Sequence, residues 1–162
     1  MFRIGIGEDT HRLAAGRKLI LGGVEIPFEL GLLGHSDADA LTHAVIDALL
    51  GACALGDIGQ HFPDSDEAFR GISSLLLAKE TAARIRAAGF ETVNIDSVIT
   101  AQKPKLAPFR EAMRANLAKA LGVPPENIGV KFTTPEGTGP EGNLECITVR
   151  AVAAVRKVRI QC

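Results

Sequence analysis

The chain has 162 residues and a formal net charge of −1, which suits one domain with a sizeable core and no highly charged partner. It contains no basic run and neither tryptophan nor tyrosine, which argues against nucleic acid as a partner. No apolar run is long enough to cross a membrane, and residues 1–4 enter a strand pattern without the apolar core of a signal peptide. We therefore expect a single cytoplasmic domain over residues 1–162 that binds neither nucleic acid nor membrane.

The three cysteines, Cys53, Cys146 and Cys162, are odd in number and form no close pair. Cys53 lies in an apolar helix pattern and Cys146 in a strand pattern. We expect buried free thiols in a reducing compartment rather than disulfides.

The first part of the chain predicts strands followed by one helix. Residues 2–7 alternate and predict a strand. Gly22-Gly23 separates two short apolar runs, as in a two-residue hairpin. Ser36 is the expected N-cap of a helix that runs toward Gly56. Residues 57–71 are rich in Gly, Pro, Asp and Ser, and predict a long functional loop or a partly ordered segment.

The second part alternates helices with strands. The expected elements are a helix from Ser73 or Ser74 to Gly89, a strand over 92–100, a helix from Pro108 to Gly122, and strands over 128–134 and 146–158. This alternation predicts an α/β sandwich, in which helices cover one face of a mixed sheet. We expect its connections to follow a ferredoxin-like arrangement.

A candidate metal site lies in the first 43 residues. Asp9 and His11 are two apart on a predicted strand, so their side chains share a face, and His43 follows on the helix. Two imidazoles and one carboxylate match a catalytic zinc site with an open position. Asp39 and Asp47 lie four residues either side of His43, and either can accept a hydrogen bond from its other nitrogen. The alternatives are a strand-end pair, an ordinary helix histidine and a solvated helix surface.

Three further segments carry groups that suit phosphate or a divalent ion. His35-Ser36-Asp37 precedes the expected helix, whose free N–H groups and dipole attract phosphate, and a capping role for Ser36 is compatible with this. Lys103 and Lys105 flank a proline between a strand and a helix, where they can meet a phosphate. Thr133-Thr134-Pro135-Glu136 supplies two hydroxyls and a carboxylate at a strand end, although an ordinary turn is the alternative.

Together these segments resemble one family. They stand in the order and spacing of 2-C-methyl-D-erythritol 2,4-cyclodiphosphate synthases, and the resemblance covers essentially the whole chain. The matching motifs are Asp9-x-His11, His35-Ser36-Asp37-Ala38-Asp39 with His43, Gly56-Asp57-Ile58-Gly59, Phe62-Pro63-Asp64-Ser65-Asp66, Pro104-Lys105 and Thr133-Thr134-Pro135-Glu136.

The resemblance implies a metal-dependent phosphorus–oxygen lyase of the non-mevalonate isoprenoid pathway. Such enzymes convert 4-diphosphocytidyl-2-C-methyl-D-erythritol 2-phosphate into 2-C-methyl-D-erythritol 2,4-cyclodiphosphate and release CMP. They are homotrimers around a threefold axis, with sites between subunits. Residues 147–152 are apolar or small apart from Arg150, which fits burial of an uncovered sheet face in such an assembly.

The resemblance also assigns roles to residues. Asp9, His11 and His43 hold one zinc ion per subunit, and Glu136 helps hold a second divalent ion, magnesium or manganese, that binds with the substrate. His35 and Thr134 stabilise the transition state. The implied substrate contacts are Ala101, Gln102, Lys103, Pro104, Lys105, Leu106 and Ala107 for cytidine; Asp57, Ile58, Gly59, Phe62, Pro63, Asp64, Ser65 and Asp66 for the methylerythritol end; and Asp9, Thr10, His11, His35, Ser36, Thr133, Thr134, Pro135 and Glu136 elsewhere.

The chain departs from the family pattern at three positions. Glu8 stands where members often carry an aromatic residue, and Pro140 and Asn143 stand where many carry Phe and Arg. These positions bear on how the residues after Glu136 contact substrate. They also bear on the binding of isoprenoid diphosphates along the trimer axis, which is suggested for some members.

Two other functions fit parts of the pattern. A zinc phosphoesterase would use a metal-bound hydroxide on the same three ligands and would incorporate solvent oxygen into its product. A metabolite-binding or regulatory module of the same fold would bind ligand without turnover.

Overall fold

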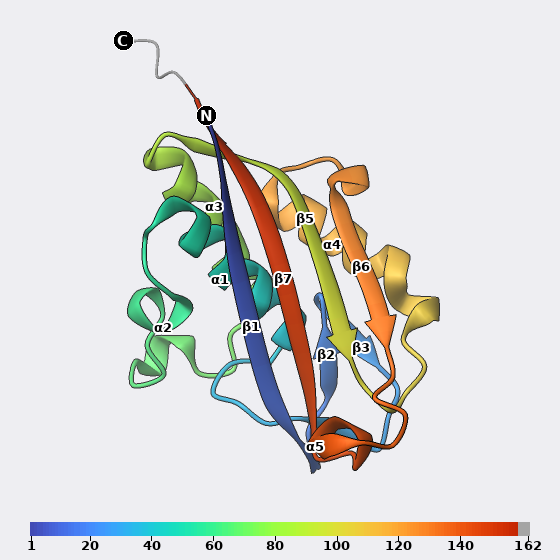
Figure 1. Cartoon of the computed structure of the whole chain (residues 1–162). Coiled ribbons are helices and arrows are strands. Elements are labelled where there is room, and N and C mark those ends of the chain that lie inside the picture. The colour runs from blue at the N-terminus through green and yellow to red at the C-terminus, as the bar shows by residue number, and fades with distance from the viewer. Residues whose placement is uncertain (159–162) are drawn as a thin grey trace.

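The computed structural model describes residues 1–158, which form a five-stranded sheet beside a layer of helices (Figure 1). The sheet has the order β4-β1-β7-β5-β6; β5 and β6 are parallel, and the other neighbours are antiparallel. β2 and β3 form a separate antiparallel hairpin. The strands are β1 (Phe2–Ala15), β2 (Leu19–Leu21), β3 (Val24–Ile26), β4 (Leu30–Leu32), β5 (Phe90–Thr100), β6 (Ile128–Thr133) and β7 (Cys146–Lys157).

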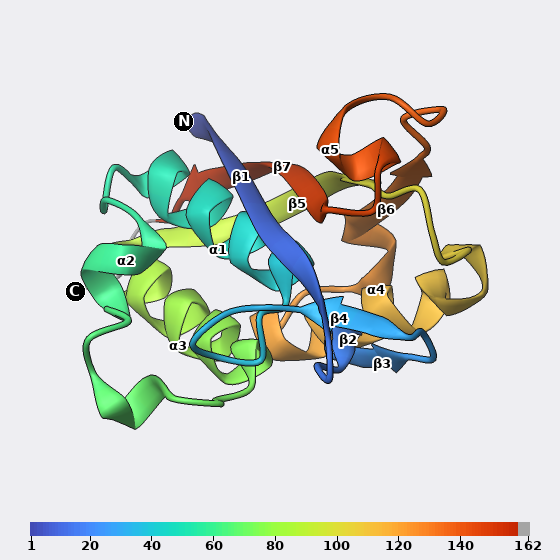
Figure 2. The ribbon, with the colours of Figure 1, turned by 90° about the horizontal axis from the view of Figure 1, so that it is seen from below.

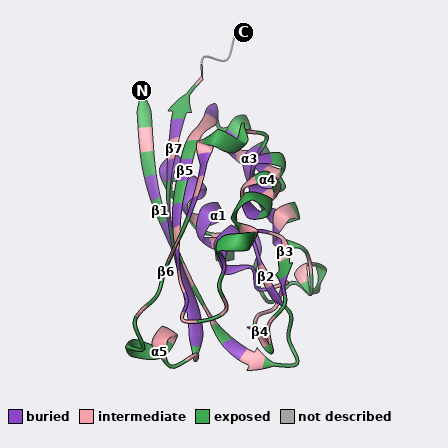
Figure 3. Cartoon of the chain, turned by 90° about the vertical axis from the view of Figure 1, so that its right-hand side faces the viewer, coloured by how far each residue is buried: buried purple, intermediate pink, exposed green. Residues whose placement is uncertain are grey.

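Three long helices, α1 (Ala40–Cys53), α3 (Ser74–Ala87) and α4 (Arg110–Leu121), cover one face of the sheet (Figure 3). α1 lies between the sheet and α3, as Figure 2 shows, which explains why most of its residues are buried. Among residues 1–158, no helix is long and apolar enough to cross a membrane. The shorter helices are α2 (Ile58–His61), α5 (Gly139–Gly142) and the 3₁₀ turns η1 (Glu67–Phe69), η2 (Ala107–Phe109) and η3 (Pro125–Asn127).

The expected α/β sandwich with a mixed sheet is confirmed, and the expected helices and strands are present with ends shifted by a few residues. The ferredoxin-like arrangement is wrong. That motif runs β-α-β-β-α-β, so its second and third strands follow each other directly. Here α4 separates β5 from β6 and makes these neighbours parallel, because parallel strands need a crossover connection.

The segment 57–71, expected to be a long functional loop or partly ordered, contains the short helices α2 and η1. Cys53 and Cys146 are buried free thiols, as expected, and Cys162 lies outside the described residues.

The N-cap of α1 is Asp39 rather than Ser36, and the helix begins at Ala40. The Asp39 carboxylate is fully buried and accepts from the N–H and hydroxyl of Thr42, at 3.0 and 2.7 Å. It also accepts from the N–H groups of Gly22 and Gly23, at 2.8 and 2.7 Å. The cap therefore joins the start of α1 to the β2–β3 hairpin, an interaction that local capping preference does not specify.

α1 lies directly on the backbone of β1, because two glycines of the strand face it. A Cβ atom at Gly5 would lie 2.1 Å from the Ala48 carbonyl oxygen, and one at Gly7 would lie 2.1 Å from the Ala44 carbonyl oxygen. Alternation along β1 turns Asp9 toward the same face of the strand. The close approach thus brings α1 within reach of the candidate metal ligands.

The other face of the sheet carries exposed apolar side chains. Phe2, Ile4 and Ile6 of β1 are 68, 73 and 72% exposed, and Val152 of β7 is 45% exposed. The three long helices lie on the opposite face, and the short α5 lies beside only the end of this one, near Thr148 (Figure 3). An apolar strand face without a covering layer is typical of a surface that meets another chain.

Gly5→Ala should lower the free energy of unfolding by at least about 1–3 kcal/mol, because the new methyl group would overlap the backbone of α1. Gly51→Ala is the matched control, since its Cβ would meet only the Ile6 carbonyl oxygen, at 3.7 Å. Alanine is also the better helix former, so this control should not be destabilised. Urea unfolding followed by circular dichroism measures both; equal stabilities would contradict the close contact.

Candidate active site

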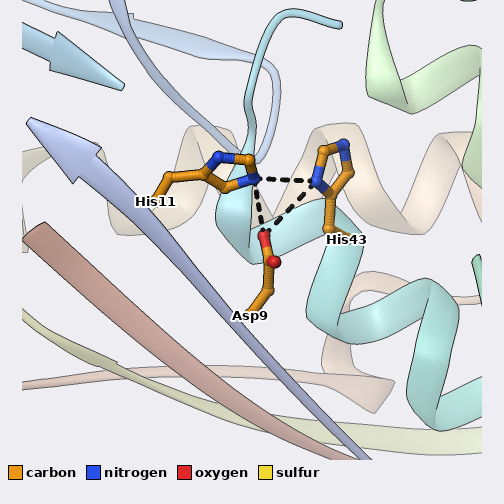
Figure 4. A group of neighbouring side chains, drawn as sticks. All are labelled: Asp9, His11 and His43. Carbon is orange, nitrogen blue, oxygen red and sulfur yellow. Dashed lines mark hydrogen bonds and ion pairs between the residues drawn. The ribbon is translucent and has the colours of Figure 1, made fainter. Parts of the chain in front are cut away.

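Three candidate metal ligands converge between β1 and α1. Asp9 and His11 project from β1, and His43 projects from α1 (Figure 4). His11 Nε2 lies 2.9 Å from Asp9 Oδ2 and 3.2 Å from His43 Nδ1. His43 Nδ1 lies 3.3 Å from Asp9 Oδ2. The structure thus brings together the three residues that the sequence singled out.

In each imidazole, the nitrogen that points away from the cluster makes a hydrogen bond. That bond decides whether the other nitrogen, which faces the cluster, has a free lone pair. His11 Nδ1 donates to the Leu33 carbonyl oxygen, at 2.8 Å, since a carbonyl can only accept. His43 Nε2 lies 2.8 Å from Ser74 Oγ. Ser74 gives its own proton to the Asp37 carboxylate, so it accepts from His43 Nε2. Two nitrogen lone pairs and a carboxylate oxygen therefore point at one another, an arrangement that a cation satisfies.

The Asp9 carboxylate has the properties of a metal ligand. Its Oδ2 atom is buried and has no hydrogen-bond partner. Burial raises the pKa of Asp9, but His11 and then His43, when they are protonated toward it, outweigh burial and hold this pKa well below its usual range. Asp9 is therefore an anion, and two imidazoles with one carboxylate fit zinc with a coordination position left for a further ligand.

A cavity of about 310 Å³ opens beside this cluster. Besides the three candidate ligands, it is lined by His35 and Ser36 and by residues of α2 and of the segment after it. The remaining lining residues are Gly34, Ile58, Gly59, Phe62, Pro63, Asp64, Phe69 and Leu77. The metal cavity therefore combines the candidate ligands, a further imidazole and a wall that is largely apolar.

A second cavity, of about 360 Å³, lies where β5 and β6 end. It shares no residue with the metal cavity. The loops around it are joined, because the Gly137 N–H donates to Gln102 Oε1, at 2.9 Å. Its lining residues are Ile99, Ala101, Gln102, Pro104, Lys105, Leu106, Ala107, Pro108, Phe132, Thr133 and Thr134. Within one chain, Thr134 and the metal ligands thus belong to different cavities.

Comparison with known proteins decides the family. The sequence model of the YgbB family matches residues 2–156. This chain belongs to the YgbB family. It is 56% identical over 155 residues to the 2-C-methyl-D-erythritol 2,4-cyclodiphosphate synthase of Clostridium botulinum, which covers 96% of this chain and 99% of that protein. The resemblance inferred from the motifs is therefore confirmed.

Another YgbB relative and two solved structures extend this agreement. The chain is 58% identical to the bifunctional enzyme IspD/IspF of Albidiferax ferrireducens over 96% of its own length, but it spans only 37% of that protein. The bifunctional IspDF of Campylobacter jejuni has a TM-score of 0.93 and 40% identity, covering 97% of this chain and 42% of that one. A CDP-bound 2C-methyl-D-erythritol-2,4-cyclodiphosphate synthase has a TM-score of 0.87 and 42% identity, covering 95% and 100%.

Several residues that the family motifs implied as substrate contacts lie outside both cavities. Thr10 lies on the open face of the sheet, where its hydroxyl is 2.9 Å from that of Thr148. Asp57 caps α2, and Asp66 caps η1. The Glu136 carboxylate is exposed and accepts from the Thr134 hydroxyl, at 2.5 Å. Lys103, Ser65 and Pro135 also line neither cavity.

The support of His43 differs from the expectation. Neither carboxylate is hydrogen-bonded to the His43 imidazole, because Asp39 caps α1 and Asp47 accepts from the Ile58 N–H, at 2.7 Å. Ser74, 31 residues away on α3, holds His43 Nε2 instead, with Ser36 Oγ at 3.2 Å. Sequence reasoning missed Ser74, since no local spacing relates it to His43.

Ser74→Ala should weaken zinc binding by about 10- to 100-fold, because His43 would lose the acceptor that fixes its tautomer. Ser73→Ala is the matched control, since Ser73 makes no capping hydrogen bond with its side chain. Competition with a chromophoric chelator measures the affinity of both variants. Equal affinities would show that the contact with Ser74 does not orient His43.

Proposed function

We propose that this chain converts 4-diphosphocytidyl-2-C-methyl-D-erythritol 2-phosphate into 2-C-methyl-D-erythritol 2,4-cyclodiphosphate and CMP, in the non-mevalonate isoprenoid pathway. The observation that carries the proposal is the convergence of Asp9, His11 and His43 in a cavity that also holds His35. Membership of the YgbB family and the relatives named above support it. The continuous hydrophobic core, from Leu13 to Val155, supports one domain over the 162 residues.

The reaction needs no protein nucleophile. An oxygen of the substrate's 2-phosphate forms a bond to the β-phosphorus. The bond from that phosphorus to the oxygen shared with CMP breaks, and its electron pair leaves with CMP. The 2-phosphate is already anionic near neutral pH, so no general base is needed. The protein must bend a flexible polyanion into line and offset its charge.

The metal cavity holds the reacting phosphates in this proposal. Asp9, His11 and His43 would hold a zinc ion, which would supply a Lewis acid for the phosphate oxygens. His35 donates to phosphate oxygens as charge shifts onto the leaving group, and Ser36 contacts the substrate beside it. Residues Ile58, Gly59 and Phe62–Asp64 form the wall that receives the methylerythritol end.

The second cavity receives cytidine. Residues 101, 102 and 104–107, with Thr133, line this cavity and would surround the nucleotide. Thr134 offers a hydroxyl to a phosphate oxygen in the transition state. The exposed Glu136 carboxylate beside it offers a hard oxygen ligand to a second divalent ion, magnesium or manganese, that arrives with the substrate.

The active unit is a homotrimer in this proposal, because one chain holds the two halves of the site in separate cavities. The exposed apolar side chains of β1 and β7 supply a face that a closed threefold assembly would bury. In such an assembly, the cytidine cavity of one chain faces the metal cavity of its neighbour.

Phosphorus NMR of the purified protein with substrate, zinc and magnesium tests the reaction. We expect cyclic diphosphate and CMP, with no oxygen taken from ¹⁸O-labelled water, because the nucleophile belongs to the substrate. An open-chain product that carries solvent oxygen would instead indicate the zinc phosphoesterase. Binding without any product would indicate the metabolite-binding module.

Mixing two inactive variants, His43→Ala and Thr134→Ala, tests the shared site. After random subunit exchange, about a quarter of the interfaces would pair an intact metal cavity with an intact cytidine cavity. Activity should therefore return to about that fraction of wild type. Mass spectrometry of mixed trimers verifies the exchange. Mixed trimers without activity, or an active monomer in light scattering, would contradict the shared site.

A further inference from the structure

We propose that Arg84, in the last turn of α3, is a positioning residue that holds the wall of the metal cavity formed by residues 58–64. The assignment of this wall to the methylerythritol end of the substrate rests on the proposed function. Arg84 itself lines neither cavity. It acts through His61, the last residue of α2, and through Phe62, the residue that follows.

The contact with Arg84 fixes the tautomer of His61. Arg84 Nη1 lies 2.6 Å from His61 Nδ1, and a guanidinium can only donate, so Nδ1 accepts. His61 Nε2 therefore carries the proton, which it donates to the Leu55 carbonyl oxygen, at 2.8 Å. Glu80, one turn earlier on α3, accepts from Arg84 Nε, at 3.1 Å, and holds the guanidinium in place. His61 thus bridges α3 and the segment that follows α1.

The same guanidinium covers an aromatic side chain of the wall. Arg84 Cζ lies 5.1 Å from the centroid of the Phe62 ring, a distance at which a cation and a ring attract each other. Phe62 is only 6% exposed and meets Phe69 edge-on, with ring centroids 5.6 Å apart. Both aromatic residues line the metal cavity. Arg84 therefore restrains two consecutive residues, one by hydrogen bonding and one by stacking.

The wall needs this restraint because α2 is only four residues long, too short to be stable by itself. Its start is held by Asp47, which accepts from the Ile58 N–H. Its end is held by Arg84 through His61. Loss of Arg84 would release the end of α2 and the residues after it, and the substrate would lose the surface that aligns it with the metal ligands.

Arg84→Met tests the role, since methionine keeps an unbranched side chain but removes the donors and the charge. Arg86→Met is the matched control, because Arg86 lies in the same last turn and donates to the Leu121 carbonyl oxygen instead. Arg84→Lys keeps the charge but not the planar fork, and should recover only part of the effect.

The first readout needs no turnover. Amide hydrogen exchange over residues 58–64 should be about tenfold faster in Arg84→Met than in Arg86→Met. ¹⁵N NMR should report His61 protonated on Nε2 alone in the wild type, and should show a changed Nδ1 signal in Arg84→Met. Unchanged exchange, or a wild-type His61 protonated on Nδ1, would overturn the proposal.

The second readout is kinetic. Arg84→Met should lower kcat/KM by about 10- to 100-fold, because a displaced wall misaligns the substrate. Zinc content and CMP affinity should stay within about twofold of wild type. The wall contains none of the three zinc ligands and no residue of the cytidine cavity. Loss of zinc or of CMP binding in parallel with activity would reduce Arg84 to a general stabilising residue and overturn the proposal. If wild type catalyses no cyclisation, the proposed function fails, while hydrogen exchange still decides whether Arg84 positions the wall.

Discussion

The direct contact between the backbones of α1 and β1 is the constraint on which the site depends. Gly5 and Gly7 leave no side chain between the strand and the helix, so Ala44 and Ala48 lie against the strand itself. His43 precedes Ala44, and its imidazole therefore meets the next residues on the same face of β1, the first of which is Asp9. The metal ligands are thus brought together by the packing of two backbones.

α3 supports the same cavity from both of its ends. At its start, the Ser74 hydroxyl accepts from His43 and donates to the Asp37 carboxylate. The Ser74 N–H donates to the same carboxylate, at 2.9 Å. At its end, Arg84 holds His61 and covers Phe62. One helix therefore contacts both a metal ligand and the wall of the same cavity.

The open face of the sheet is divided along its strands into an apolar and a polar part. Ile6 lies opposite Val152, and the next pair on this face is Glu8 with Arg150, which form an ion pair. Beyond it, Thr10 pairs with Thr148, whose hydroxyl donates to Glu141, at 2.6 Å. The apolar part suits burial against another chain. The polar part shows that Glu8, a departure from the family pattern, has a charged partner within its own chain.

His43 reaches Asp9 and His11 only because α1 packs on β1. The sequence by itself determined most of the strands, the hairpin at Gly22-Gly23 and the placement of Asp9 and His11 on one face of a strand, because these follow from local periodicity and spacing. It did not determine the connectivity of the sheet, which depends on the crossover through α4. Ser36 and Asp39 are both good capping residues, and only the N–H groups arriving from the β2–β3 hairpin favour Asp39. Only the tertiary structure decided that Ser74 supports His43 and that His35 and Thr134 lie in separate cavities, since these relations join segments that share no local pattern.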